Sequence, residues 1–520
     1  MTLNYLLLTA TFIPLVAALL SLIRNERRYT AAVSVASLLL SLSLIAYTAF
    51  YSGLFTNPAT SRYLESYSWQ PLGNVGFQLD GLSLTFSLII ALVGSMVAIY
   101  SYYFMDKHFE TLGSRRWSAY YFLYLTFIFG MLGTVLSTNL VEFYIFFELM
   151  LIPSYFLIAE FGYSGRSNAS FSYFIWTHIG ALVMLAGLIA IAFTFRTLDL
   201  NAIYAYTHGS AAPFIISSRV VLYASVAILL GLMVKLGGFG LHVWLPSAYK
   251  EAPAPVSATL SALMSGIAGY AIIRILAFDL PTSFAVISPY LVIWGIISLL
   301  YGGFTALSQD DVRLLLAYSS VSQMGYMAIG IGSNTAFGLA GSVSLYAANG
   351  FAKAILFMMA GLLTLQTGQI AMSRMGGLAG RLPYMTTFSM IGFLTMMGVP
   401  PTFGFIAEFF IFQGIFASSL LHSSSSLLLL AFLALIGSII TSAYSLWAVK
   451  KIFFGRQTIQ NPVAESPSSH ATSIMLRQNS YLLLPLAILA AASVIAGIYP
   501  FLFSNSFAYL SSVLLVGVVS

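Results

Sequence analysis

The chain of 520 residues contains no cysteine and very little charge. Without cysteine it cannot form a disulfide, a thiolate zinc site or a cysteine-ligated iron–sulfur cluster. Charged residues make up 7% of the chain and hydrophobic residues 59%, whereas soluble domains are roughly 25% charged and about 45–50% apolar. So few charges could not keep a folded surface solvated. The composition therefore predicts an all-α polytopic membrane protein.

Long apolar runs give the number of membrane spans. A helix needs about 20 mainly apolar residues to cross a bilayer, and fourteen segments fit that template. The run 383–420 is too long for one crossing and contains Pro400-Pro401, so we expect a broken helix or two short ones there. Residues 1–22 are expected to form a retained first span, and 501–520 are left unassigned. The predicted spans are 4–23, 31–51, 79–104, 118–137, 139–162, 170–195, 219–240, 256–278, 284–307, 313–332, 336–366, 383–420, 427–450 and 480–502.

The positive charges are distributed unevenly between the two sides of this predicted bundle. Nucleic-acid binding would need lysine and arginine gathered on one face, but here they are scattered singly through loops. Positive residues concentrate in cytoplasmic loops, so we expect both termini on the non-cytoplasmic side of the cell membrane. The cation-poor side holds Arg62, Arg196 and Arg219, and Lys235, Arg274 and Lys353 lie within helices. The cation-rich side holds Arg24, Arg27, Arg28, Lys107, Arg115, Arg116, Arg166, Lys250, Arg313, Arg374, Arg381, Lys450, Lys451, Arg456 and Arg477.

Four ionisable residues fall deep within separate predicted spans: Glu148, Lys235, Lys353 and Glu408. A charge at membrane depth costs several kcal/mol unless it is paired or hydrated, and is by default a functional candidate. Two static salt bridges are the structural alternative, but buried ion pairs contribute little net stability. Two acids and two bases on four helices therefore favour an ion path across the bundle.

Other polar residues are weaker candidates. Histidine can relay protons near neutral pH, which makes His178 and His242 candidate relay groups. Four further charges lie within a turn or two of a predicted helix end, where a structural role at the interface is the simpler interpretation. These are Asp80, Glu142, Glu160 and Arg274.

Glycine and proline interrupt two spans, close to two of the buried charges. The segment 235–246 begins with Lys235, and the segment 398–404 precedes Glu408. Interrupted segments at corresponding places in two halves indicate inverted repeats around a central ion path. The broken spans are the seventh and twelfth, so spans 4–8 and 9–13 are expected to form paired five-helix repeats. The predicted division is 1–117 for helices 1–3, 118–278 and 284–455 for the two repeats, and 456–520 for helix 14 and the tail.

Three groups of residues form motifs in or beside these helices. They are Phe147-Glu148-Leu149-Met150 with Pro153 and Tyr155; Lys235 with His242-Val243-Trp244-Leu245-Pro246 and Glu251-Ala252-Pro253; and Asp311-Val312-Arg313-Leu314-Leu315-Leu316-Ala317-Tyr318-Ser319-Ser320 with Gln323-Met324-Gly325-Tyr326. Together they resemble the antiporter-like membrane subunits of respiratory complex I (NADH-quinone oxidoreductase), from about residue 80 to 455. Glutamate at position 408 is similar to the M type of that family, because the L and N types generally carry lysine there.

The resemblance implies a proton-translocating subunit with no redox centre or cofactor of its own. NADH, FMN, iron–sulfur clusters and quinone would belong to partner subunits, and the partners would be other membrane-arm subunits and the lipid bilayer. Glu148 would hold Lys235 charged, and the proton would pass through Lys353 to Glu408. In the family the eighth helix usually carries lysine or histidine, and many relatives have histidine where this chain has Asn349. We therefore expect Ser265, Tyr270, Asn349 or His178, with water, to bridge the centre.

Several alternatives share these features or compete with them. Multi-subunit cation/proton antiporters, energy-converting hydrogenases and F420H2 dehydrogenases carry similar motifs. A stand-alone transporter for Na⁺ or an organic solute is a second class. A membrane-embedded enzyme with an acidic metal site is a third, but Asp310-Asp311 is the only adjacent acidic pair. We interpret that pair as the start of a helix, where acids lie beside the positive end of the dipole.

Overall fold

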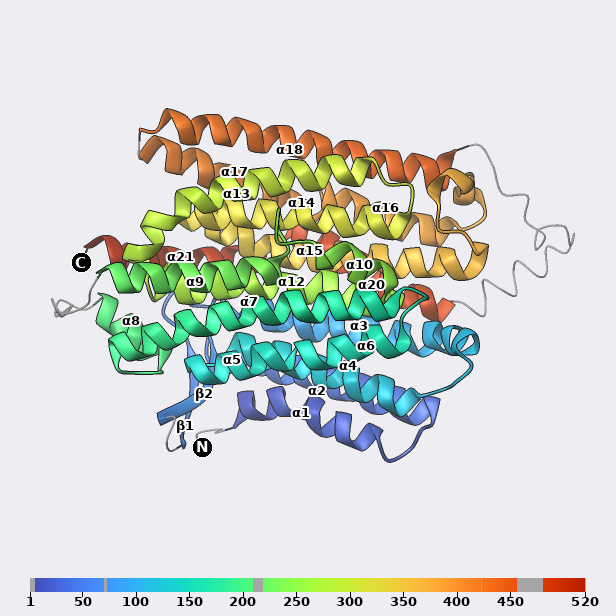
Figure 1. Ribbon diagram of the computed structural model, residues 1–520, viewed down its shortest axis with the longest axis horizontal. Helices are drawn as coiled ribbons and strands as arrows, with labels where there is room; N and C mark the ends of the chain where they lie inside the picture. The colour runs from blue at the N-terminus through green and yellow to red at the C-terminus, as the bar shows by residue number, and fades with distance from the viewer. Residues whose placement is uncertain (1–4, 70–72, 209–217, 422, 456–479, 520) are drawn as a thin grey trace, which may run out of the picture.

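The computed structural model describes residues 5–69, 73–208, 218–421, 423–455 and 480–519. These residues form a bundle of long helices whose axes run roughly along one direction (Figure 1). Within these described ranges, twelve helices are long and apolar enough to cross a membrane, or 13 if one bent pair counts as a span. The prediction of an all-α polytopic membrane protein is therefore confirmed. The count of fourteen stays a prediction, because the first helix has only 16 residues.

The N-terminal part combines three helices with a small β-hairpin. The two strands pair antiparallel, with Tyr63 opposite Leu79. The buried Glu65 carboxylate accepts hydrogen bonds from the backbone N–H groups of Leu7 and Leu8, each at 2.9 Å. The hairpin thus satisfies free amides at the start of the first helix. The elements are α1 (Leu6–Ser21), α2 (Arg27–Tyr51), β1 (Tyr63–Trp69), β2 (Gly73–Leu79) and α3 (Ser83–Leu112).

The second group of helices contains the first predicted break. An irregular stretch between Leu236 and Trp244 separates α9 from α10, which confirms the broken seventh span. The eighth span alternates α and π turns, and π turns are frequent at functional sites. The elements are α4 (Trp117–Leu136), α5 (Leu140–Leu149), α6 (Leu151–Phe161), α7 (Arg166–Phe195), α8 (Leu200–His208), α9 (Ser218–Leu236), α10 (Trp244–Glu251), α11 (Ala254–Thr259), η1 (Leu260–Met264), α12 (Ser265–Ala271) and η2 (Ile272–Phe278).

The third group contains the second break. Residues 397–402 separate α16 from α17, so the run 383–420 forms two short helices. Small residues let α13 and α14 approach closely: a Cβ on Gly302 would lie 2.5 Å from the backbone nitrogen of Ser322. The elements are α13 (Pro281–Leu307), α14 (Val312–Gly332), α15 (Ala336–Thr367), η3 (Met372–Arg374), η4 (Leu378–Gly380), α16 (Pro383–Met396), α17 (Phe403–Leu421), α18 (Ser425–Val449) and η5 (Lys450–Phe454).

The last two helices form a bent pair against the middle of the bundle. Helix α20 (Ser480–Ile498) and helix α21 (Phe501–Val519) meet at an angle of 55°. The tail that the sequence left unassigned is therefore helical. Both helices contact α15. Residues 456–479, which include the predicted loop cations Arg456 and Arg477, lie outside the described residues.

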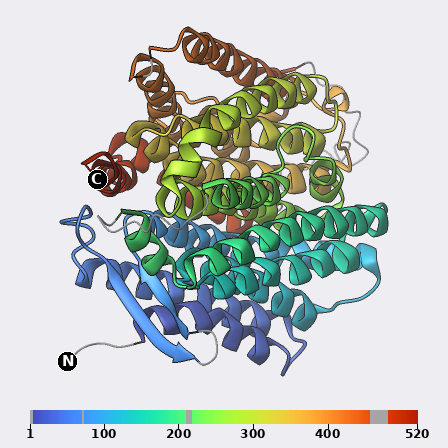
Figure 2. The same cartoon turned by 60° about the vertical axis from the view of Figure 1, so that its left-hand side comes forward.

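The hairpin, α8 and α21 share one end of the molecule, which is the left-hand end in Figure 1. Figure 2 shows the hairpin on the N-terminal half of the bundle, away from the orange helices α17 and α18. The hydroxyl of Ser512 on α21 donates a hydrogen bond to the Ala59 carbonyl at 3.1 Å. The first and last parts of the chain therefore meet at this end.

Candidate functional site

The four buried charges predicted from the sequence lie on four different helices. Glu148 is on α5, Lys235 on α9, Lys353 on α15 and Glu408 on α17. Lys235 and Lys353 are 2% and 0% exposed, and Glu408 is 5% exposed. All three are therefore withdrawn from solvent by the protein itself. The Glu148 side chain retains 20% exposure.

Glu148 pairs with a histidine rather than with the lysine. Its Oε2 lies 2.9 Å from Nδ1 of His178 on α7. Lys235 lies close enough to interact electrostatically with Glu148, but its Nζ sits 4.8 Å from the centroid of the Phe147 ring. Within the described residues no ion pair under 4.0 Å joins Glu148 to Lys235. His178 is thus brought to the acid, and the lysine is held by a cation–π contact.

The break after Lys235 is held in place by the residues that follow it. The indole N–H of Trp244 donates to the Val234 carbonyl at 3.0 Å. His242 is 8% exposed, and its ring lies 5.0 Å from that of Tyr301. Its Nδ1 has no hydrogen-bond partner among the described residues. The structure therefore leaves this histidine nitrogen free to exchange a hydrogen bond with water beside the unwound segment.

Lys353 is held by the tenth span. Its Nζ donates to the Leu316 carbonyl at 2.8 Å and to the hydroxyl of Ser319, both on α14. Neither partner is charged. The ammonium group therefore has hydrogen-bond acceptors but no counter-ion at hydrogen-bond distance in the part of the chain that the structure describes. Such a group can give up its proton without breaking an ion pair.

Serine hydroxyls connect Lys353 toward the eighth span. Ser320, next to Ser319, shares a 2.8 Å hydrogen bond with Ser261 on η1. The Ser261 carbonyl accepts from Ser265 at 3.3 Å and from Asn349 at 3.4 Å. Two of the expected bridging residues, Ser265 and Asn349, therefore meet at one carbonyl. The Oδ1 atom of Asn349 is buried without a partner among the described residues, which suits a bound water.

Tyr270 does not join this central group. Its hydroxyl accepts a 3.2 Å hydrogen bond from Nε of Arg274, near the end of the eighth span. Arg274 in turn contacts both carboxylate oxygens of Asp80 at 2.8 and 2.7 Å. Tyr270 therefore belongs to a second polar cluster, closer to the hairpin end of the molecule.

Glu408 lies beside the second break. Ser438 on α18 donates a 3.3 Å hydrogen bond to its Oε2, and Oε1 has no partner among the described residues. The hydroxyls of Tyr326 and Thr441 are 3.4 Å apart, and Tyr326 interacts electrostatically with Glu408. Hydroxyl groups from two helices, α14 and α18, thus lie near this acid.

The remaining charges near helix ends have structural partners. Arg116 and Glu160 form an exposed pair at 2.9 Å, as a position at the interface predicts. Asp80 and Arg274 instead form a buried pair, with side-chain exposures of 0% and 12%. Asp311 caps α14 by accepting from the Arg313 amide at 2.8 Å, which confirms the helix-start interpretation of the acidic pair.

Four serines that hold or connect the charges were not singled out from the sequence. Their signal is weak, because serine is common in membrane helices and often bonds only its own backbone. Two of them stand side by side in the motif before Gln323, and that adjacency is the clearest hint. The four are Ser261, Ser319, Ser320 and Ser438.

Comparison with known proteins identifies the family. The family model described as "NADH:quinone oxidoreductase/Mrp antiporter, TM" matches residues 137–441, more than half of the chain. The chain belongs to this family. A second model, "NADH-Ubiquinone oxidoreductase (complex I), chain 5 N-terminus", matches residues 69–112. The resemblance predicted from the motifs is therefore confirmed.

Individual relatives in this family cover most of the chain. The chain is 30% identical to F(420)H(2) dehydrogenase subunit M of Methanosarcina mazei, over 85% of this chain and 86% of that protein. It is also 30% identical to NADH-quinone oxidoreductase subunit M of Rickettsia bellii, over 78% and 77% respectively. A chain of respiratory complex I from Thermus thermophilus superposes with a TM-score of 0.78 at 27% identity, covering 98% and 99% of the two chains.

Proposed function

We propose that this chain is a proton-translocating membrane-arm subunit of a complex I-type quinone oxidoreductase. The observation that carries the proposal is a set of four ionisable residues on four helices: the buried Lys235, Lys353 and Glu408, and the partly buried Glu148. Buried ionisable groups in spans mark ion paths when stability does not require them. Subunits of such oxidoreductases are among the relatives, which supports the same assignment.

The contacts of the buried groups favour transfer along hydroxyls and water. Lys353 contacts Ser319, and the neighbouring Ser320 contacts Ser261. A protonated lysine would release its proton to a hydroxyl or water, becoming a neutral amine, while that hydroxyl passes its own proton onward. Hydroxyl groups are suited to this because each can accept and donate a hydrogen bond. The proton would reach Lys353 from Lys235 and leave it toward Glu408.

The signal that starts transfer would act on the Glu148 end. His178 contacts Glu148 directly, whereas Lys235 interacts with the acid at longer range. An opposite charge nearby favours the protonated form of lysine. Neutralising Glu148, or moving it further from Lys235, would therefore favour the neutral form of Lys235 and drive its proton toward Lys353.

The redox chemistry would take place in partner subunits. NADH or a similar donor, FMN, iron–sulfur clusters and quinone would be bound there, and this chain would contribute the ion path. The matching family description also names Mrp antiporters, so a subunit of a cation/proton antiporter is the second candidate. Neighbouring genes for quinone-reductase, hydrogenase or cation-antiporter subunits would separate the parent complexes.

The decisive variant at the input end is Lys235→Ala. We expect the assembled complex in liposomes to lose translocation through this subunit while quinone reduction and subunit composition are retained. Glu148→Ala is expected to give the same result, because it removes the partner that sets the lysine charge. Proton uptake is measured with a pH-sensitive dye during quinone reduction.

Lys250→Ala is the matched control, because its ammonium group is partly exposed and 3.9 Å from Asp311. It should translocate protons as the wild type does. Wild-type proton uptake by the Lys235→Ala complex would contradict the proposal. Uptake that requires Na⁺ and no electron donor would favour the antiporter candidate.

A further inference from the structure

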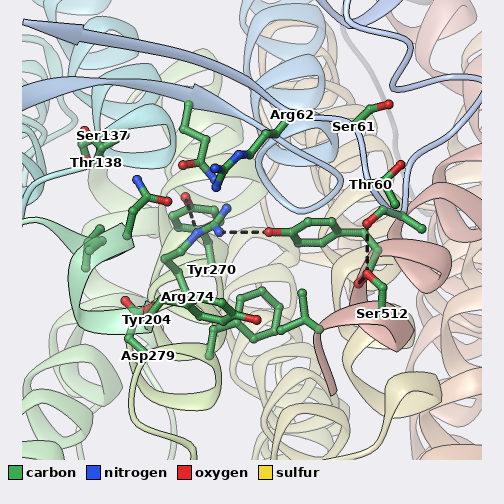
Figure 3. Close-up of a pocket in the computed structure, with 17 residues that line it drawn as sticks. Thr60, Ser61, Arg62, Ser137, Thr138, Tyr204, Tyr270, Arg274, Asp279 and Ser512 are labelled. Carbon is green, nitrogen blue, oxygen red and sulfur yellow. Dashed lines mark hydrogen bonds between the residues drawn. The ribbon is translucent and has the colours of Figure 1, made fainter. Parts of the chain in front are cut away.

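A polar cavity of about 400 Å³ lies at the hairpin end of the molecule (Figure 3). Its walls come from connections that are far apart in the sequence: 59–62 before β1, 137–138 before α5, the start of α8, Asp279 and α21. The connections 59–62 and 137–138, the start of α8 and Asp279 all lie on the side of the bundle that the charge distribution predicts to be cation-poor. A volume of this size holds several water molecules.

One wall of the cavity is formed by side chains that hydrogen-bond to Asp80. Arg274 contacts both oxygens of Asp80, and Asp80 also accepts from Gln78 at 2.8 Å and from Tyr509 at 2.9 Å. Burial alone would raise the pKa of the Asp80 carboxyl, but Arg274 and these hydrogen bonds hold it below its ordinary value. The Asp80 carboxylate is therefore ionised near neutral pH and has no proton to give up.

Asp279 is buried like Asp80 but differs from it in its hydrogen bonds. It lies just beyond the end of the eighth span, lines the cavity and is 3% exposed. Its Oδ2 has no hydrogen-bond partner in the part of the chain that the structure describes. Burial raises the pKa of this carboxyl well above its usual range; Arg274 opposes that effect and Asp199 adds to it. A lone buried carboxyl beside water can take up and release protons under mild conditions.

The eighth span connects this carboxyl to the centre of the bundle. Ser265 contacts the central group, and Arg274 lies nine residues further along, about 13 Å at 1.5 Å per residue. On α15, Tyr346 precedes Asn349 by three residues and so shares its face. The Tyr346 hydroxyl is buried without a partner among the described residues, as is Oδ1 of Asn349. Unpaired buried groups of this kind mark positions for water.

A single side chain separates the two hydroxyl-bearing rings along this line. The Phe86 ring lies 4.2 Å from that of Tyr346 and 5.1 Å from that of Tyr270. Tyr270 and Arg274 both line the cavity. The polar positions therefore continue from Asn349 through Tyr346 and Tyr270 to the cavity, with the apolar Phe86 ring in contact with both tyrosine rings.

We infer that this cavity is a proton-release chamber in which Asp279 is the last protein group to hold the translocated proton. The carboxylate takes the translocated proton from a hydronium ion on its inner side, which becomes water, and the carboxylate becomes a carboxylic acid. It then gives the proton to cavity water, returning to the carboxylate and forming hydronium on the cation-poor side. The inference rests on the proposed function and adds to it an exit along the eighth span from the central group of Ser265 and Asn349, beside the branch from Lys353 toward Glu408.

The test uses the complete complex in liposomes, with proton movement and quinone reduction measured together. We expect Asp279→Asn to lose as much translocation as Lys353→Met while keeping quinone reduction, and Asp279→Glu to restore it. Asn201→Trp, which fills the cavity from α8, should cause the same loss. Glu110→Gln is the control, because this carboxyl is 47% exposed and lies on the predicted cation-rich side.

Each outcome decides one of two questions. Suppose that Lys353→Met translocates fewer protons than the wild type, while Asp279→Asn and Asn201→Trp translocate as many. The release chamber is then wrong, and the proposed function stands. If wild type and Lys353→Met translocate equally, the proposed function itself fails. Should Asp279→Asn not assemble, wild-type translocation by Asn201→Trp would still overturn the chamber.

Discussion

At the scale of single residues, the same side-chain type plays opposite roles depending on its partners. Asp80 is bound by an arginine, a glutamine and a tyrosine, whereas Asp279 has an oxygen with no partner among the described residues. Arg274 is likewise fixed by Asp80, while Lys353 has only a carbonyl and a hydroxyl. In our proposal, stability and proton transfer thus depend on different charges.

Asp80→Asn is expected to destabilise the protein strongly. Removing one partner of a buried ion pair leaves the other charge uncompensated and costs about 3–5 kcal/mol. Asp106→Asn removes the acid of a more exposed pair, with side-chain exposures of 29% and 21%, and should cost less. Thermal unfolding of the purified complex measures both, and equal losses would contradict the structural role of Asp80.

The same carboxyl gives this prediction a pH dependence. The pKa of Asp80 is below its ordinary value of 3.8 in the folded protein, so the folded state binds fewer protons there than the unfolded state does. The stabilisation is therefore complete above that ordinary value and is lost as the pH falls below it. The wild type should lose stability more steeply than Asp80→Asn in this acidic range.

The sequence was enough to find the four charges but not their hydrogen-bond partners. An ionisable residue inside an apolar run is visible in the sequence because it is costly. The partner of Glu148 was not visible, since His178 reaches it only through the packing of α7 against α5 and α6. Ser319 and Ser438 were missed for the same reason.

At the scale of elements, the two breaks place backbone and charges together. Gly398 has a positive φ of 64°, and a Cβ there would lie 2.8 Å from the carboxyl carbon of Glu408. Only glycine fits such a conformation and such an approach without strain. The unwound segment thus forms part of the wall around the acid.

Gly398→Ala should therefore impair translocation without changing Glu408 itself. The added methyl group would displace the carboxylate from Ser438, and the left-handed backbone would cost about 1–2 kcal/mol. We expect proton uptake to fall toward that of Glu408→Gln while quinone reduction remains. Gly380→Ala is the control, because no atom lies within 4 Å of the added carbon. Full translocation by Gly398→Ala would argue against this role of the break.

The matched contacts of the two five-helix units support the repeat, which stays a prediction. The Leu140 amide donates to the Leu198 carbonyl, and the Leu200 amide to Thr138. The same pair of bonds recurs 172 positions later, from Val312 to Ile370 and from Met372 to Asp310. The breaks were visible in the sequence because glycine and proline interrupt helices. The π turns of the eighth span and helix α21 were not, because tertiary contacts decide them.

At the scale of the whole molecule, the distribution of positive charges predicts how the bundle is oriented in the membrane. The cavity connections lie on the predicted cation-poor side, so the direction of transport depends on that orientation. Because the chain has no cysteine, single introduced cysteines can report it. In sealed vesicles we expect Arg62→Cys and Lys107→Cys to react with a membrane-impermeant maleimide from opposite sides. Reaction of both from one side would refute the assignment.

In the complete complex, removing the Lys353 ammonium group should reduce proton translocation and leave electron transfer to quinone unchanged. Lys353 is fully buried, its partners lie on α14, and it stands at the centre of the proposed path. Replacing it with methionine keeps the length of the side chain and removes the proton site. The most direct measurement is the number of protons translocated per electron by the Lys353→Met complex in liposomes. A ratio below the wild-type value with quinone reduction retained is the predicted result, and an unchanged ratio would contradict the account.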